Sequence, residues 1–168
     1  MPKEPLYNVR REAVMTRLFE AEVELVFDAW TDPAQVGKWW GSRAFTNVVY
    51  EWEARPGGCI HLGMIAPCGT EFGVKGSFHE VAEPERLQFT SLSFEDDNGH
   101  AQLEILNTAI FTLDQQKTRL TLQAVVIRST PEVYDTLDGI ETGWKQSLDK
   151  LEDHLAGVIA TGNHFDLL

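Results

Sequence analysis

The longest regular feature of this 168-residue chain is an apolar stripe close to its C-terminus. From residue 133 onward, apolar side chains recur at steps of three and four, the spacing of one face of an α-helix. The stripe consists of Val133, Leu137, Ile140, Trp144, Leu148, Leu151 and Leu155. Thr130 can cap such a helix, and Pro131 suits its first position, where an N–H would have no partner. A helix of about 25 residues is roughly 37 Å long, which is enough to cross a whole β-sheet.

The other faces of this helix are mainly charged, with residues such as Glu141 and Lys145. We therefore expect one side to be covered by a sheet and the other to stay in water. Gly139 and Gly143 interrupt the helix, and each costs about 1 kcal/mol relative to alanine. They form a shallow groove that allows close approach of the sheet or of a ligand, and close packing against the sheet is the simpler explanation.

The N-terminal part of the chain predicts one strand and two short helices. Apolar and polar residues alternate over 14–19, as in a strand. From Glu22 to Trp30 the apolar residues change to helical spacing. Asp32 is a plausible N-cap for a second short helix that starts at Pro33 and ends near Trp40.

Glycine, proline and asparagine turns divide the stretch up to Arg128 into further strands. We place these strands at 46–54, 58–65, 71–81, 86–94, 101–113 and 117–127. Such a sheet must twist, and curling around one helix gives it a concave interior. The sequence thus predicts an α+β helix-grip fold: a seven-stranded curved antiparallel sheet with two short helices and one long C-terminal helix.

Composition limits the classes of function. With 43% hydrophobic and 24% charged residues, the chain predicts one globular domain at residues 12–157, with a flexible arm at 1–11 and a tail at 158–168. Its net charge of −12 should repel nucleic acid and anionic lipid. We find no apolar run of the roughly 18 to 20 residues that span a bilayer, so we expect a cytoplasmic protein. Its cysteines, Cys59 and Cys68, are expected to be reduced thiols.

Several short stretches resemble, in order, the successive signatures of one protein family. They are 17–21, 26–33, 38–41, 55–58, 84–87 and 143–144. Over about residues 12–156 the chain resembles bacterial homologues of the C-terminal domain of the activator of the heat-shock chaperone Hsp90 ATPase, within the START-like, birch-pollen-allergen-like superfamily. The resemblance implies a helix-grip fold with a cavity between the last helix and the sheet. It implies no fixed reaction, because superfamily members include binders of lipids, sterols or polyketides as well as cyclases and hydroxylases.

Large side chains of the concave face are the candidates for the cavity wall. We expect a ligand to contact Trp40, Phe45, Ile60, Leu62, Phe72, Val74, Phe78, Phe89, Asn107, Ile140, Gly143 and Trp144. The same residue types also build filled cores, so the sequence leaves open whether they line a cavity or fill it.

Two of these expectations depend on side-chain direction. Either Asn107 or Thr108 must face the concave side, where it could hydrogen-bond a ligand or a water molecule. Trp39 and Trp40 are neighbours and differ by about 100° on a helix. We expect one to guard the cavity mouth or a dimer surface and the other to pack in the core.

Candidates for catalysis and metal binding are weak. Cys59 and His61 share one face of a strand, and His79 on the next strand could complete a zinc-like set. That face is opposite Ile60 and should be exposed, so we expect no metal and no cofactor. Glu80 could turn inward and act as an acid or base, although solvation at the sheet edge is the simpler reading.

The sequence therefore favours a non-enzymatic binder of a small hydrophobic or amphipathic molecule. One alternative is a co-chaperone-like module that binds a chaperone partner. Another is a cyclase- or hydrolase-type enzyme that uses the same cavity with Glu80. A homodimer is compatible with each of them.

Overall fold

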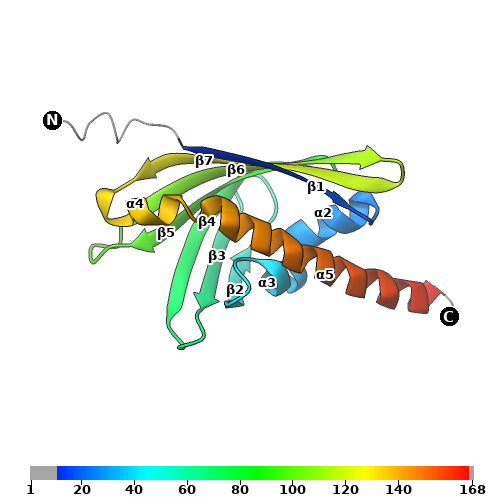
Figure 1. Ribbon diagram of the computed structural model, residues 1–168, viewed down its shortest axis with the longest axis horizontal. Coiled ribbons are helices and arrows are strands. Elements are labelled where there is room, and N and C mark those ends of the chain that lie inside the picture. The colour runs from blue at the N-terminus through cyan, green and yellow to red at the C-terminus, as the bar shows by residue number, and fades with distance from the viewer. Residues whose placement is uncertain (1–10, 167–168) are drawn as a thin grey trace.

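The computed structural model describes residues 11–166 (Figure 1), so most of the arm expected at 1–11 and the last two residues of the expected tail lie outside the described part. The elements are β1 (Glu12–Phe19), α2 (Val23–Thr31), α3 (Pro33–Trp39), β2 (Thr46–Trp52), β3 (Cys59–Ile65), β4 (Glu71–Ala82), β5 (Arg86–Glu95), β6 (Ala101–Asp114), β7 (Lys117–Ser129), the 3₁₀ turn η1 (Pro131–Val133), α4 (Tyr134–Leu137) and α5 (Ile140–Asp166). The strands and short helices follow the order that the sequence predicts.

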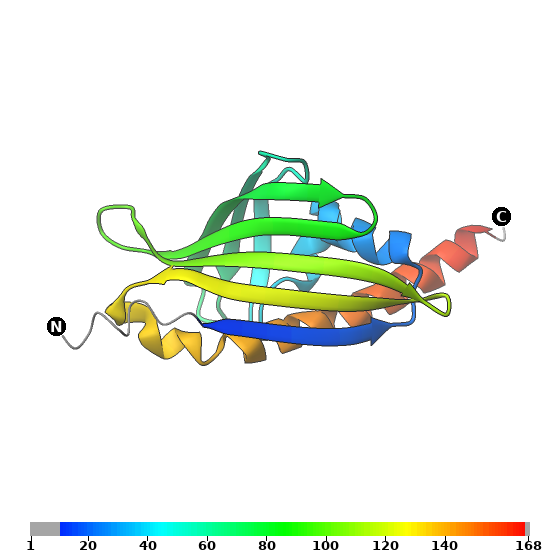
Figure 2. The same cartoon turned by 90° about the horizontal axis from the view of Figure 1, so that it is seen from above.

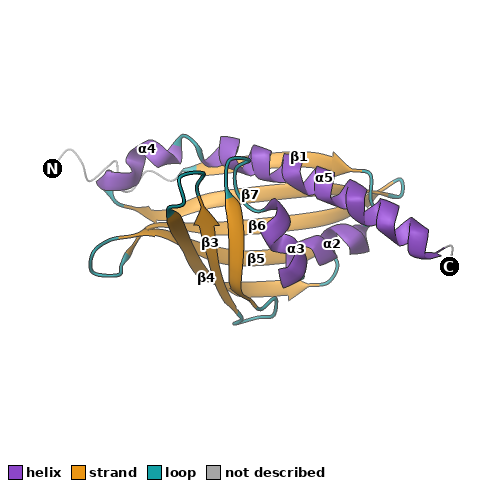
Figure 3. Cartoon of the chain, turned by 90° about the horizontal axis from the view of Figure 1, so that it is seen from below, coloured by secondary structure: helices purple, strands orange, loops and turns teal. Residues whose placement is uncertain are grey.

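One antiparallel sheet contains all seven strands, in the order β1-β7-β6-β5-β4-β3-β2. The helices lie on one face of this sheet: Figure 2 shows the long strands with the helices behind them, and Figure 3 shows α5 crossing that face beside α2 and α3. The predicted α+β helix-grip fold is confirmed.

The two short helices begin and end largely as their residues predict. Ala34 N–H donates to Asp32 Oδ1 at 2.9 Å, which confirms Asp32 as the N-cap of α3, with Pro33 at the first helical position. The helix ends at Trp39, because Trp40 has an extended backbone with φ −66° and ψ 138°. This short exit carries the chain from α3 towards β2.

The C-terminal helix differs from its expected form at both ends. The predicted continuous start at Pro131 is wrong: the chain forms η1 and α4, breaks at Gly139, and starts α5 at Ile140. Gly139 N–H donates to the carbonyl oxygen of Thr136, which closes a turn tighter than an α-helix. Thr130 is not a side-chain cap, because its hydroxyl hydrogen-bonds Gln102 at 2.8 Å. The helix continues to Asp166 and so includes most of the segment expected as a tail.

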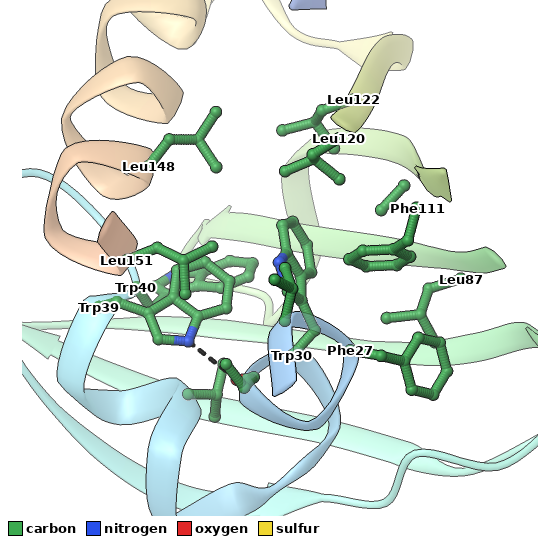
Figure 4. Packing of buried hydrophobic residues seen from close by; sticks show 14 of the residues in the cluster. Phe27, Trp30, Trp39, Trp40, Leu87, Phe111, Leu120, Leu122, Leu148 and Leu151 are labelled. Atoms are coloured by element: carbon green, nitrogen blue, oxygen red, sulfur yellow. Dashed lines mark hydrogen bonds between the residues drawn. The ribbon is translucent and has the colours of Figure 1, made fainter. Parts of the chain in front are cut away.

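An aromatic cluster fills one end of the concave face (Figure 4). Trp30 and Trp39 are fully buried, with ring centroids 4.7 Å apart. Trp39 Nε1 donates to Ala29 O at 2.9 Å, and Trp52 Nε1 donates to Trp30 O at 2.8 Å. Leu148 and Leu151 of α5 belong to the same core and pack beside this cluster. The rings and their hydrogen bonds join α2, α3, β2 and α5 into one core.

The contact between α3 and α5 contains a histidine whose protonation opposes folding. His154 Nε2 lies 2.8 Å from Gln35 Oε1, and Gln35 Nε2 donates to Asp32 Oδ2 at 3.1 Å. Partial burial, and next the positive charge of Lys38, hold the pKa of His154 below its usual 6.5, while Asp32 acts in the opposite direction.

We predict that acidification weakens the fold through His154. The pKa of His154 is lower in the folded state, so the unfolded chain binds the proton more readily. The stabilisation that neutral His154 contributes is therefore complete above about pH 6.5 and is lost as the pH falls towards the folded-state pKa. His154→Gln removes the titrating group and keeps a polar side chain. Urea unfolding at a series of pH values should show a steeper loss of stability on acidification in the unmodified protein than in the variant. Parallel curves would contradict this account.

Candidate functional site

A cavity of about 820 Å³ lies between the concave face of the sheet and the first turns of α5. Strands β3 to β6 and the segment that follows α3 also contribute to its wall. The structure brings most of the predicted residues together there: Trp40, Phe45, Phe72, Val74, Asn107, Ile140, Gly143 and Trp144. Phe45 and Phe72 meet at a ring distance of 6.0 Å. The arrangement offers a ligand a largely aromatic and aliphatic surface.

The remaining predicted residues do not line the cavity. Ile60, Leu62, Phe78 and Phe89 are buried in the closed core instead. Phe78 and Phe89 are opposite each other in the sheet, with ring centroids 5.6 Å apart, and Trp52 packs against both. The prediction that these four residues line the cavity is wrong, because the aromatic cluster covers this end of the concave face.

A change in side-chain size along β4 and β5 divides the filled end from the hollow end. The sheet pairs Phe78 with Phe89, but the next inward pair is Gly76 and Ser91, followed by Val74 and Ser93. Only glycine fits at position 76, because a β-carbon there would lie 1.8 Å from the carbonyl oxygen of Thr90. Ser91 and Ser93, which are not among the predicted wall residues, also line the cavity. The signal was available: both continue the inward alternation of Leu87 and Phe89.

Gly143 provides open space in the roof of the cavity. A β-carbon built on Gly143 would meet no atom within 4 Å, so close packing against the sheet does not explain this glycine. Gly139 lies at the break before α5 rather than within the helix. Both glycines nevertheless line the cavity, so they leave room there rather than allowing close packing against the sheet.

Two tryptophans join the cavity to the closed core. Trp144 stacks on Trp30 with ring centroids 5.7 Å apart and an interplanar angle of 14°, and it meets Trp40 edge-on at 5.3 Å. Trp40 lines the cavity while Trp39 is enclosed in the core. The rings of Trp39 and Trp40 are both buried, because α3 ends at Trp39 and the extended backbone of Trp40 releases its ring from helical spacing. Lys150 of α5 donates to the carbonyl oxygen of Trp40 at 3.1 Å and so holds this wall against the roof.

The polar groups in the wall are few and specific. Asn107 faces the cavity, and its Nδ2 donates to Ser91 Oγ at 3.1 Å. Thr108 faces the opposite side, where Gln88 Nε2 donates to its hydroxyl at 3.2 Å. The buried hydroxyl of Ser147 donates to the carbonyl oxygen of Trp39 at 2.8 Å. Of the two side chains between which the sequence could not choose, Asn107 is the one at the cavity.

The charged side chains that border the cavity are exposed. Tyr50 donates to Glu71 at 2.6 Å, and this hydrogen bond raises the pKa of the tyrosine. Lys75 and Glu95 form an ion pair at 3.0 Å. The charges are thus confined to the rim, and the deeper wall consists of neutral groups.

Glu80 lies away from the cavity and pairs with Arg86 Nε at 2.8 Å. The weaker alternative, in which Glu80 turns inward, is wrong, because a register shift between Phe78 and Glu80 interrupts the alternation of β4. Glu80 lines a separate open groove with Glu22 and Glu85. The carboxylate therefore does not face a molecule bound in the cavity.

The side chains considered as a weak zinc-like set have separate partners. His61 packs against Tyr50 with ring centroids 4.7 Å apart, and His79 hydrogen-bonds Thr90 at 2.5 Å. Within residues 11–166 the metal-type donors that converge are Cys59, Glu51 and Glu53, all exposed. The charge of Glu51, followed by that of Glu53, raises the pKa of the Cys59 thiol. These carboxylates thereby reduce the fraction of reactive thiolate.

Comparisons with known proteins agree with this architecture. A family model described as Activator of Hsp90 ATPase homolog 1-like protein matches residues 20–156. A solution structure from Arthrobacter aurescens is similar over 87% of this chain and 86% of its own, with a TM-score of 0.78 and 22% identity. A crystal structure of the AHSA1 protein from Silicibacter pomeroyi is similar over 87% of this chain and 98% of its own, with a TM-score of 0.72 and 24% identity. The likenesses to these two structures show the shared fold. The search of curated proteins finds no match.

The position of Trp144 at the border of the cavity predicts a graded cost of truncation. Trp30→Ala should reduce the free energy of unfolding by about 3–5 kcal/mol, because that ring is fully enclosed, and Trp144→Ala should cost less than about 3 kcal/mol, because one side of its ring already faces open space. Urea unfolding of both variants measures the difference. An equal or larger loss for Trp144→Ala would mean that the space beneath α5 is filled.

Proposed function

Because the chain belongs to the Activator of Hsp90 ATPase homolog 1-like family, whose model matches residues 20–156, we propose that it binds a small hydrophobic or amphipathic molecule between α5 and the sheet. The cavity of about 820 Å³ is the observation that carries this proposal. Binding sites for small molecules commonly have volumes of roughly 300–1,000 Å³ and walls that are mostly apolar.

The wall supports an apolar ligand in particular. The rings of Trp40 and Trp144 meet edge-on, and Val74, Ile105 and Ile140 contribute aliphatic surface around them. Removing apolar surface from water yields about 25 cal/mol per Å², so a ligand that covers these side chains gains affinity without any charged contact. The wall rests on the closed aromatic core, which limits the reorganisation that binding requires.

Chaperone binding is a second candidate function, and the description of the family suggests it. The outer face of the sheet carries the exposed apolar side chains Val14, Leu18 and Ile110 on β1 and β6. A protein partner or a second copy of the chain could cover them. Binding of purified Hsp90 that is abolished by Leu18→Glu but retained by Gly143→Leu would favour this alternative. Analytical ultracentrifugation of the same Leu18→Glu variant tests the homodimer.

An enzymatic role through Glu80 has less support, because its carboxylate is paired with Arg86 outside the cavity wall. Unchanged turnover in Glu80→Gln across a substrate screen would exclude that residue. The acidic net charge of −12 disfavours nucleic acid as a partner. No helix in the described part of the chain has the length and apolar character needed to cross a membrane.

Filling the roof of the cavity provides a direct test of ligand binding. Gly143→Leu should place its side chain in the ligand's space and weaken the binding of Nile red roughly five-fold or more, because overpacking a site costs about 1–3 kcal/mol. The helix itself should gain stability from the loss of glycine. A fluorescence titration with Nile red measures the affinity.

Gly157→Leu is the matched control. Gly157 is also inside α5, but it is exposed, and a β-carbon there meets no atom within 4 Å. This variant should bind the dye as the unmodified protein does. No saturable dye binding to the unmodified protein, or equal binding to both variants, would overturn the proposal.

A further inference from the structure

The cavity wall contains a buried amide whose hydrogen-bonding capacity is only partly used. Asn107 is 1% exposed, and three oxygens surround its Nδ2: Ser91 Oγ at 3.1 Å and the carbonyl oxygens of Phe89 and Ile105, each at 3.4 Å. These acceptors fix the orientation of the amide, since only the nitrogen can donate to them. No donor within residues 11–166 reaches Asn107 Oδ1.

A buried acceptor without a partner is costly, and buried polar groups are therefore nearly always hydrogen-bonded. Other side chains in the wall satisfy this rule, since Ser147 donates to the carbonyl oxygen of Trp39. Among the described residues that line the cavity, Asn107 is the one with a buried polar atom that lacks a partner. A bound molecule that donates a hydrogen bond to its Oδ1 would remove the cost.

Ser91 adds the complementary group beside Asn107. Its Oγ accepts from Asn107 Nδ2, and its own proton has no acceptor within the described residues. An acceptor and a donor thus lie next to each other in an otherwise largely apolar wall. A hydroxyl group matches this pair, because it donates through its proton and accepts through its oxygen.

The distribution of charge around the cavity limits the chemical class of the ligand further. The charged residues at the cavity, Glu71, Lys75 and Glu95, are exposed at the rim, while Asn107 and Ser91 are buried. A carboxylate or an ammonium group next to Asn107 would lose its hydration without gaining an opposite charge. The chemistry of the buried end therefore suits an uncharged group.

On the basis of the proposed binding function, we propose that the ligand is an uncharged alcohol or phenol with an apolar body. Its hydroxyl donates to Asn107 Oδ1 and accepts from Ser91 Oγ. Its apolar part lies against Trp40, Ile105 and Trp144.

Two probes of nearly the same shape test this assignment. 2-Naphthol has a hydroxyl where 2-methylnaphthalene has a methyl group, and displacement of Nile red measures the affinity of each. In the unmodified protein, the preference for 2-naphthol over 2-methylnaphthalene should exceed that of Asn107→Leu by about three- to ten-fold, the usual worth of one neutral hydrogen bond. Comparing the ratio between proteins cancels the different hydration of the two probes.

Thr108→Val is the matched control, because Thr108 is the next residue of β6 and faces away from the cavity. It should leave the ratio unchanged. Ser91→Ala should lower the preference for 2-naphthol over 2-methylnaphthalene, as Asn107→Leu does. If Asn107→Leu does not fold, Ser91→Ala alone tests the hydroxyl assignment.

The outcomes separate this inference from the proposed function. If both probes bind and the ratio is the same in all variants, the hydroxyl assignment is wrong and the apolar binding site remains. If neither the probes nor Nile red bind to the unmodified protein, both conclusions fail.

Discussion

The packing of α5 across the concave face of the sheet is the interaction on which the rest of the structure depends. Leu148, Leu151 and Leu155 bury the middle of the helix in the main core. Arg17 of β1 reaches this helix and pairs with Asp149 at 2.6 Å, which ties the sheet edge to the same element. The first turns of α5 then form the roof of the cavity. A helix held firmly along its middle can cover an open space at its start, because the packed part supplies the stability that the hollow part does not.

The filled and hollow ends of the interior belong to one continuous sheet. Phenylalanines face each other at the filled end, and glycine and serine replace them one inward pair further along the same two strands. The backbone passes between the two regions without interruption, so the aromatic cluster supports the cavity directly. The stack of Trp30 on Trp144 connects a ring in the rigid core with one at the cavity. Such an arrangement suits a preorganised site, since little has to move when a molecule enters.

Asn107 lies where these two regions meet, and it illustrates a tension between stability and function. An apolar residue there would continue the core row of Phe78 and Phe89, whereas the amide leaves an acceptor unsatisfied at the cavity. Departures from the best local packing are expected mainly at functional sites. Glu80 and Cys59 are weaker candidates for a functional role. Glu80 is paired with Arg86, and the carboxylates beside the exposed Cys59 raise the pKa of its thiol.

The sequence by itself determined the order of the elements, the N-cap of α3 and the side of the sheet that α5 covers, because periodicity and capping depend on neighbours along the chain. It also identified much of the cavity wall, from Trp40 to Trp144. Only the tertiary structure decided that Phe78 and Phe89 fill the interior, that Asn107 rather than Thr108 faces the cavity, and that a register shift carries Glu80 away from it. It also placed open space beside Gly143. Whether an inward side chain fills a space or borders it depends on the volumes contributed by distant strands and helices, and no local pattern in the sequence records their sum.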